Sequence, residues 1–302
     1  MRHLPEHLHN EPITKLAIPG THDSFAFHLT FHPGPDLVPA LRRLRIFIYP
    51  IIKNWSITQD KNFTEQLQIG IRYFDLRVCR TQDRNVRTRS PFQFTHGLLG
   101  HLVRDGLEEI NEFLNKHSKE IVLIDFNHFY DFDAEHGHDQ LIRLIHEIFG
   151  KKLCTTARTI NECTLNYLWK NKQQVILLYE HNADQCSAYM DRIGHFFQVC
   201  QSPWPNTSRV EDLFLFLDER IATSRPINCV NIVQGQLTPD SSSIQSNPFG
   251  SLCAYAKETN RVLIEWISYR QRDPSLINGV NVIICDFADQ VFADAVIMLN
   301  YK

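Results

Sequence analysis

Several features that define whole classes of protein are missing from this sequence. None of the eight cysteines forms a Cys-x-x-Cys pair, which argues against a structural zinc site. There is no long run of lysine or arginine, and the formal net charge is -3, so we expect no nucleic-acid partner. No apolar stretch reaches about 18 residues and the N-terminus has no apolar signal core, so we expect neither a membrane-spanning helix nor a signal peptide.

What remains is the composition of a globular enzyme in a reducing compartment. The 302 residues are 43% hydrophobic and 22% charged, which is enough to bury a substantial core. Several cysteines lie inside apolar runs, as Cys285 does in Val-Ile-Ile-Cys-Asp, and we interpret them as reduced, buried thiols of a cytoplasmic protein. No Gly/Ser/Pro-rich linker and no internal repeat divides the chain, so we predict a single domain over residues 1–302.

Short apolar, β-branched runs recur along the chain and indicate strands. Most are continuously apolar, which is typical of strands buried on both faces in a parallel sheet. Helical patterns fall between them, and this alternation favours an α/β fold, a parallel (β/α)8 barrel of the TIM type. Residues 33–57 do not fit the alternation, and we interpret them as an inserted loop or helix. The predicted strands are 16–18, 71–78, 92–95, 121–126, 175–179, 230–234 and 280–287.

Polar side chains lie at the carboxyl ends of these runs. In a (β/α)8 barrel those ends share one face, which is where active sites lie. We therefore expect two histidines, several carboxylates and one arginine to converge in a single mouth. The polar residues at these ends are His22 and Asp23 after the first run, Asp75 and Arg77 in the second, His96 after the third, Asp125, Asn127 and His128 at the end of the fourth, and Asp286 in the last. Of these, we interpret Asp125 and His128 as polar residues that terminate their strand.

Two histidines, carboxylates and an arginine suit phosphodiester chemistry. One histidine can take a proton from an attacking hydroxyl while the other gives a proton to the leaving oxygen, because unperturbed histidine titrates near pH ~6.5. The arginine can neutralise charge on the phosphoryl oxygens, and carboxylates behind the histidines can orient them. Among the 15 histidines, His22 and His96 stand out because Gly20 and Gly97 beside them permit tight turns.

Some of these residues also have purely structural interpretations. Asp75 and Arg77 lie two apart on one strand and could form a buried structural ion pair. Asn127 could reach the site as a substrate-binding residue or simply terminate its strand. Trp204 could bind a sugar ring or the membrane at the rim, or pack within a turn. Residues 41–53 combine three arginines with apolar side chains, which would suit either a membrane surface or a covered helix.

Three motifs together resemble the X-domain signature of phosphatidylinositol-specific phospholipases C. They are Ile18-Pro-Gly-Thr-His22-Asp23-Ser24, Gly70-Ile-Arg-Tyr-Phe-Asp75-Leu-Arg77 and Thr95-His96-Gly97. The likeness covers nearly the whole chain and is greatest to the small animal proteins that consist of an X domain alone. It implies a distorted (β/α)8 barrel, a phosphoinositide lipid as substrate and peripheral contact with the membrane.

The resemblance also implies a two-step reaction. The inositol 2-hydroxyl attacks the phosphorus, which forms a cyclic 1,2-phosphate and releases diacylglycerol, with His22 as general base and His96 as general acid. The carboxylates and the arginine have supporting roles in this scheme: Asp286 orients His22, Asp23 is the partner of His96, Asp75 helps to handle the attacking hydroxyl, and Arg77 binds the phosphate.

Position 77 bears on the metal requirement. Calcium-dependent members of the family carry a carboxylate there, because calcium needs several oxygen ligands, whereas secreted bacterial members carry arginine. A guanidinium and a calcium ion would repel each other at one site. With Arg77 in this position, we predict calcium-independent chemistry with no metal and no other cofactor.

Head-group recognition departs from the family pattern. Bacterial members have basic residues after the fifth strand, where this chain has Tyr179-Glu180-His181. Asp125-Phe126-Asn127 stands where a lysine or glutamate is expected. An alternative to the enzyme is therefore a phosphoinositide-binding or scaffolding protein that keeps the pocket without efficient turnover. A glycerophosphodiester phosphodiesterase is disfavoured, because it would need metal-binding carboxylates where Arg77 stands.

Overall fold

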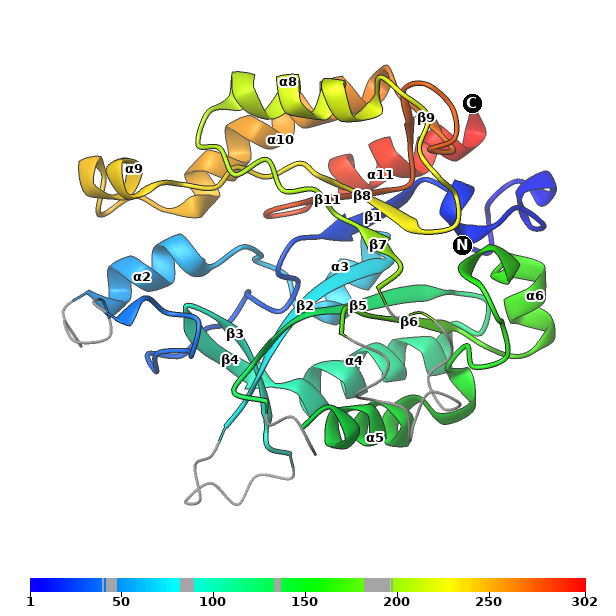
Figure 1. Cartoon of the computed structure of the whole chain (residues 1–302), viewed down its shortest axis with the longest axis horizontal. Helices are drawn as coiled ribbons and strands as arrows, with labels where there is room; N and C mark the ends of the chain where they lie inside the picture. The colour runs from blue at the N-terminus through cyan, green and yellow to red at the C-terminus, as the bar shows by residue number, and fades with distance from the viewer. Residues whose placement is uncertain (40, 42–47, 82–89, 133–136, 182–195, 197) are drawn as a thin grey trace.

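The centre of the molecule is a parallel sheet built from the buried apolar runs (Figure 1). A computed structural model describes residues 1–39, 41, 48–81, 90–132, 137–181, 196 and 198–302. Seven strands pair in parallel in the order β6-β5-β2-β1-β11-β8-β7. They are β1 (Ile18–Thr21), β2 (Tyr73–Arg80), β5 (Val122–Tyr130), β6 (Val175–Tyr179), β7 (Cys200–Gln201), β8 (Val230–Gln234) and β11 (Val282–Cys285). Each of these strands except β7 overlaps a predicted run, and β7 was not predicted.

The two edges of this sheet meet. At the end of β6, the main-chain N–H of Tyr179 donates to the carbonyl of Phe196 (3.1 Å), and the N–H of Gln198 donates to the carbonyl of Tyr179 (3.2 Å). Phe196 and Gln198 lie just before β7, so these bonds join β6 to the strand at the other edge. The described residues thus form a distorted barrel of seven parallel strands, one fewer than the predicted eight.

The run at 92–95 forms a hairpin instead of a barrel strand. β3 (Phe92–His96) runs antiparallel to β2 and returns through Gly97 into β4 (Leu98–Leu102). Gly97 has a φ of +68°, a left-handed conformation that favours glycine. The parallel direction expected for this strand is therefore wrong, since β3 pairs antiparallel with β2. The one-residue turn at Gly97 is far too short for a parallel crossover, so β4 also returns antiparallel to β3.

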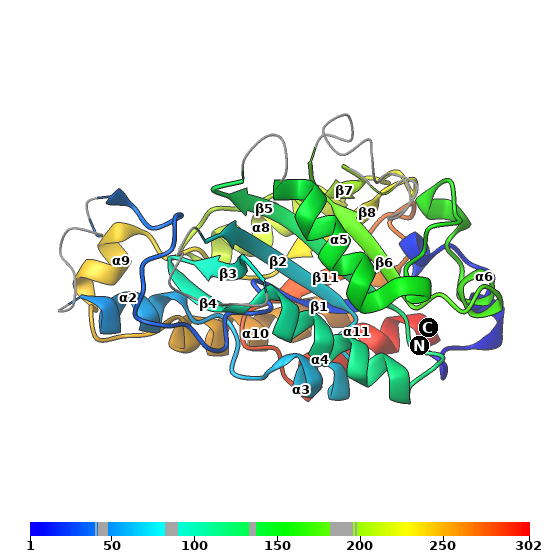
Figure 2. The same ribbon diagram turned by 90° about the horizontal axis from the view of Figure 1, so that it is seen from below.

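Helices cover the barrel on its outer faces. In Figure 1, α8, α10 and α11 lie on one side of the strands, and α4 and α5 lie on the other. In Figure 2, α2 and α9 lie together beyond the arrowheads of β2 and β5, at the end of the barrel where the strands finish. None of the described helices is both long and apolar enough to span a bilayer.

The helices and the remaining short elements have the following bounds. The α-helices are α2 (Tyr49–Ser56), α3 (Phe63–Gln68), α4 (Val103–Lys116), α5 (Gly137–Phe149), α6 (Leu165–Lys170), α8 (Val210–Ile221), α9 (Ser241–Ser246), α10 (Leu252–Ser268) and α11 (Gln290–Met298). The 3-10 helices are η1 (Glu6–Leu8), η2 (Ile13–Lys15), η4 (Gly150–Lys152), η5 (Ile160–Glu162) and η7 (Leu299–Tyr301). Two short strands, β9 (Gln271–Arg272) and β10 (Gly279–Val280), pair separately from the barrel.

Alternation along each strand separates the barrel interior from the outer core. On β2, Phe74 and Leu76 join the hydrophobic cluster that packs against the helices, whereas Tyr73 joins a second cluster inside the barrel. Asp75 and Arg77 follow Tyr73 at two-residue spacing, so they share its inward face. A shift of one residue in the strand pairing would turn the apolar side chains to the opposite face. Because burial of each large apolar side chain contributes roughly 1.5–3 kcal/mol to folding, such a shift is strongly disfavoured.

The segment that interrupts the alternation lies against the hairpin. Pro33 bridges to Leu98 of β4, and the N–H of Gly34 donates to the carbonyl of Gly97 (2.9 Å). Helix α2 then occupies the end of the segment and stops at Ser56. The described part of residues 33–57 is thus a loop and a helix beside His96. The three arginines of the 41–53 stretch fall outside the described residues.

Candidate active site

His22 follows β1 directly and is held by the residue that follows β11. Its main-chain N–H donates to the carbonyl of Cys285 (3.1 Å). Its Nδ1 lies 2.7 Å from Oδ1 of Asp286, the carboxylate expected to orient it. Only 14% of the His22 side chain is exposed. The Nε2 atom, on the other side of the ring, lies 3.3 Å from Nη2 of Arg77. These contacts leave Nε2 as the atom of His22 that faces the site.

Asp23 lies at the centre of the charged cluster rather than behind one histidine. Its Oδ2 is 3.2 Å from Nε2 of His22 and 3.3 Å from Nε2 of His96, and its Oδ1 is 2.8 Å from Nε of Arg77. The side chain is fully buried, and the residue adopts a positive φ of 39°. The main-chain N–H of Asp23 donates to Oδ2 of Asp75 (3.0 Å). Asp23 is therefore shared by both histidines and the arginine.

The hairpin turn brings His96 to the same cluster. The rings of His22 and His96 lie 6.2 Å apart, centroid to centroid, with their planes at 77°. Nδ1 of His96 lies 2.8 Å from the carbonyl oxygen of Ser56, the last residue of α2. A main-chain carbonyl of the inserted segment thus fixes the His96 ring, with Asp23 at its other nitrogen.

A β-bulge brings two consecutive residues of β5 into the barrel. The register between β2 and β5 shifts after Leu76, so that Arg77 lies opposite His128 and Asn127 is the extra residue. Asn127 donates through Nδ2 to Oδ1 of Asp75 (2.5 Å), and its Oδ1 lies 2.7 Å from Nδ1 of His128. Asn127 and His128 both line the cavity. Of the two, the sequence analysis selected only Asn127.

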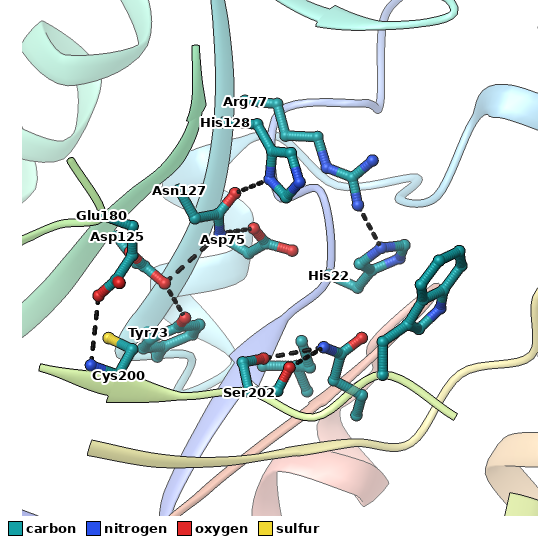
Figure 3. A pocket seen from close by; sticks show the side chains of 13 residues that line it. His22, Tyr73, Asp75, Arg77, Asp125, Asn127, His128, Glu180, Cys200 and Ser202 are labelled. Carbon is teal, nitrogen blue, oxygen red and sulfur yellow. Dashed lines mark hydrogen bonds between the residues drawn. The ribbon is translucent and has the colours of Figure 1, made fainter. Parts of the chain in front are cut away.

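Part of this cluster lines a cavity of about 420 Å³ inside the barrel mouth (Figure 3), whereas Asp23, His96 and Asp286 are not among its lining residues. Arg77 and His22 lie at one end of the view, and Asp125 and Glu180 at the other. Trp204 also lines the cavity, is 55% exposed, and donates through Nε1 to Oγ1 of Thr238 (2.9 Å). The lining residues are His22, Tyr73, Asp75, Arg77, Asp125, Asn127, His128, Glu180, Cys200, Ser202, Trp204, Gln234 and Ile284.

Comparison with known proteins connects this geometry to a family. The model of the phosphatidylinositol-specific phospholipase C X domain matches residues 50–181. PI-PLC X domain-containing protein 2 of Mus musculus is 40% identical, with 99% of this chain and 86% of the relative covered. Protein 3 of Homo sapiens is 35% identical, with 100% and 92% covered. The chain belongs to the PI-PLC X domain family.

The X-domain fold of this chain matches solved bacterial structures. The phosphatidylinositol-specific phospholipase C from Listeria monocytogenes matches with a TM-score of 0.65 at 20% identity, covering all of this chain and 97% of that one. One from Staphylococcus aureus matches with a TM-score of 0.66 at 17% identity, covering 95% and 93%. This likeness confirms the predicted TIM-type barrel, although the closing strands of the described residues are short.

The charged cluster of the X domain shifts the pKa values of its members. Burial lowers the pKa of His22, but the carboxylates of Asp23, Asp286 and Asp75 raise it by more, to about 9. Burial raises the pKa of Asp23, but the positive charges of Arg77 and the neighbouring histidines lower it by more, to about 2. At neutral pH, Asp23 is therefore a carboxylate and His22 is a cation.

The inner wall of the X-domain cavity holds a second polar group. The hydroxyl of Tyr73 donates to Oδ2 of Asp125 (2.5 Å), and the main-chain N–H of Cys200 donates to Oε1 of Glu180 (3.2 Å). Burial raises the pKa of both Asp125 and Glu180. These residues come from β2, β5, the end of β6, and β7, so no single motif contains them.

The sequence analysis missed one residue that joins the loops of the X-domain site. Gln59 donates through Nε2 to the carbonyls of His22 (2.9 Å) and Cys285 (3.0 Å), and its Oε1 accepts from the N–H of Ala288 (3.2 Å). It thereby ties the β1 loop that carries His22 to the β11 loop that carries Asp286. Nothing in the sequence around Gln59 indicates this role, because the two loops that it joins are brought together only by the fold.

Proposed function

We propose that this X domain is a calcium-independent phosphodiesterase that cleaves phosphatidylinositol-type lipids by paired histidine catalysis. One observation carries the proposal: His22 and His96 approach one buried carboxylate from two sides, with the Arg77 guanidinium against the same carboxylate. In this arrangement two proton carriers and one fixed cation surround one buried carboxylate, and two of these three residues, His22 and Arg77, line the cavity.

Each residue has a place in the proposed first step. Nε2 of His22, in its neutral form, takes the proton of the inositol 2-hydroxyl, whose oxygen forms a new bond to phosphorus. The bond from phosphorus to the glycerol oxygen breaks, and protonated His96 gives that oxygen a proton, which releases diacylglycerol. Arg77 stabilises the charge on the phosphoryl oxygens. Water then opens the cyclic phosphate with the two histidine roles reversed.

Three carboxylates hold this machinery in position. Asp286 accepts from Nδ1 of His22 and fixes its tautomer, so that Nε2 faces the substrate. Asp23 keeps His22, His96 and Arg77 together around one negative charge. Asp75 supports the Asp23 main chain and holds Asn127 at the cavity wall. In the proposal, Asp75 lies beside the attacking hydroxyl, and Asn127 and Trp204 contact the head group.

The position of Arg77 supports chemistry without a metal. Oxygen and nitrogen atoms of His22, Asp23 and Asp75 lie within 4.8 Å of one another, close enough to hold a cation. Nε of Arg77, however, is 2.8 Å from Oδ1 of Asp23. Two like unit charges 4 Å apart repel each other by roughly 4 kcal/mol at an effective dielectric constant of 20. A guanidinium would repel a divalent cation more strongly than that. The guanidinium thus stands in for the ion.

A vesicle assay with chelator tests this proposal. We expect the purified full chain to release cyclic inositol phosphate, followed by inositol phosphate, from vesicles that contain phosphatidylinositol. The rate should be the same with EDTA as with added calcium. Activity that disappears with EDTA and returns only with calcium would overturn the metal independence. If neither product forms under either condition, the enzyme proposal itself fails and a binding role remains.

We also propose that the mouth of the cavity contacts the membrane surface. Phe31 and Val38 are 55% and 58% exposed and belong to the segment that lies along β4 beside His96, and Trp204 is equally exposed at the cavity. The ammonium of Lys53 lies 5.0 Å from the Phe31 ring. Apolar side chains beside a positive charge suit an anionic lipid surface. The described cysteines are all free thiols, which supports the cytoplasmic leaflet as that surface.

Replacing Phe31 with serine tests this contact. We expect Phe31→Ser to weaken sedimentation with phosphatidylinositol vesicles by about tenfold, because a buried phenylalanine contributes roughly 1.5–3 kcal/mol. Hydrolysis of soluble cyclic inositol phosphate should not change. Leu215→Ser, at a 62% exposed position on the outer helix α8, is the matched control. Equal losses from both variants would contradict a membrane surface at the mouth.

A further inference from the structure

The inner wall of the cavity contains a hydrogen-bonding group that the proposed reaction does not use. Asp125 is 1% exposed, and its Oδ1 has no hydrogen-bond partner among the described residues. Glu180 lies beside it in Figure 3, and a carboxylate oxygen of each residue lies within 4.8 Å of the other and of the Cys200 sulfur. Buried polar atoms are nearly always paired in proteins, so an unpaired oxygen at a cavity wall indicates a ligand that supplies the donor.

The geometry of this pair is fixed by its neighbours. Asp125 is held through Oδ2 by the Tyr73 hydroxyl, and Glu180 through Oε1 by the main-chain N–H of Cys200. Asn127 donates to Asp75 and, at 3.4 Å, to Asp125. A continuous set of hydrogen bonds therefore runs from the catalytic cluster to the inner wall. If the scissile phosphate binds at His22 and Arg77, as proposed, the rest of the head group would extend along the cavity toward Asp125 and Glu180.

The charge of this wall decides what it can hold. Among the described residues that line the cavity, Arg77 is the one lysine or arginine, and it already pairs with Asp23. Hydroxyl groups donate to carboxylate oxygens, whereas a second phosphate has acceptors and negative charge to offer. A phosphate placed against Asp125 and Glu180 would therefore be repelled, and a ring hydroxyl would be bound.

We infer that Asp125 and Glu180 are a head-group selectivity pair, which binds free hydroxyls of a polyol and excludes head groups that carry phosphate at those positions. The inference rests on the proposed function, because it places the scissile phosphate at His22 and Arg77. It makes phosphatidylinositol with an unmodified ring the favoured substrate over its ring-phosphorylated forms.

A comparison of two lipids in one assay tests the inference. We expect kcat/KM for phosphatidylinositol to exceed that for phosphatidylinositol 4,5-bisphosphate by at least ~10-fold, both in the same neutral carrier vesicles. Glu180→Lys should lower this ratio of kcat/KM values by ~10-fold or more, because it replaces a negative charge with a positive one. Glu180→Gln, which keeps an oxygen acceptor for the N–H of Cys200, should lower the ratio less. Glu211→Lys, whose side chain is 77% exposed on α8, should leave the ratio unchanged.

The outcomes separate this inference from the proposed function. Equal cleavage of both lipids, a preference for the bisphosphate, or an unchanged ratio in folded Glu180→Lys and Glu180→Gln would overturn the selectivity pair. A ratio that changes with EDTA would also overturn it, because the pair would then hold a metal. If wild type cleaves neither lipid, the proposed function fails. The inference is then tested by calorimetry, which compares the affinity of the protein for myo-inositol 1-phosphate with its affinity for inositol 1,4,5-trisphosphate. Tighter binding of the trisphosphate would refute the selectivity pair.

Discussion

Replacing His22 or His96 with alanine is expected to lower turnover of phosphatidylinositol by at least ~100-fold, the usual effect of losing a general acid or base. His22→Ala removes the base and leaves the carboxylate of Asp286 without its partner. His96→Ala removes the donor to the leaving oxygen. Because both act in one step, the double variant should be little worse than either single variant.

Two measurements keep this result specific to catalysis. His7→Ala, at an exposed position on η1, should retain full turnover and controls for the loss of a histidine as such. Thermal unfolding of each variant shows whether the barrel is intact, since His22→Ala leaves two buried carboxylates short of a positive neighbour. A folded variant of His22 or His96 with wild-type turnover would refute the assigned roles.

The pH profile of kcat/KM is expected to be a bell with one limb near pH 9. The proposed first step needs His22 neutral and His96 protonated, so kcat/KM follows the fraction of enzyme in which both conditions hold. Burial lowers the pKa of His22, but the surrounding carboxylates raise it by more, to about 9. Histidine without these neighbours would titrate near pH ~6.5. A limb near pH 9 is therefore the signature of the carboxylates around His22.

Asp286→Asn provides a sharper form of the pH experiment. It removes one of the carboxylates that raise the pKa of His22, so the limb of kcat/KM near pH 9 should move to lower pH. The plateau should fall as well, because an amide holds the ring less firmly than a carboxylate. Asp294→Asn, exposed on α11, should change neither. A wild-type profile without a limb near pH 9, or a limb there that Asp286→Asn does not move, would contradict His22 as the base.

The local motifs allowed much of the cluster to be predicted. His22, Asp75 and Arg77 lie in short segments where strand period and chain order place them at one mouth. Asp286 was expected beside His22, and the structure places it there at 2.7 Å. Asp23 was expected beside His96 and lies 3.3 Å from it, but its contacts with His22 and Arg77 were not predicted, because they depend on strands that meet only in the folded barrel.

The hairpin shows why His96 was placed in the site for an incorrect reason. Its run was expected to end a parallel barrel strand, but β3 is antiparallel, and the turn at Gly97 brings His96 to the cluster. Its ring is then fixed by the carbonyl of Ser56. A main-chain carbonyl has no sequence signature, so no pattern in residues 33–57 indicated this contact.

By itself, the sequence determined the barrel and the residue types of its mouth, because continuous apolar runs, the helical patterns between them and the polar residues at their ends are local properties of the chain. Only the tertiary structure decided which groups share a partner. The sharing of Asp23, the bulge that turns both Asn127 and His128 inward, and the pairing of Asp125 with Glu180 depend on the register between strands far apart in sequence. Register is fixed by packing of the whole sheet, which no single segment encodes.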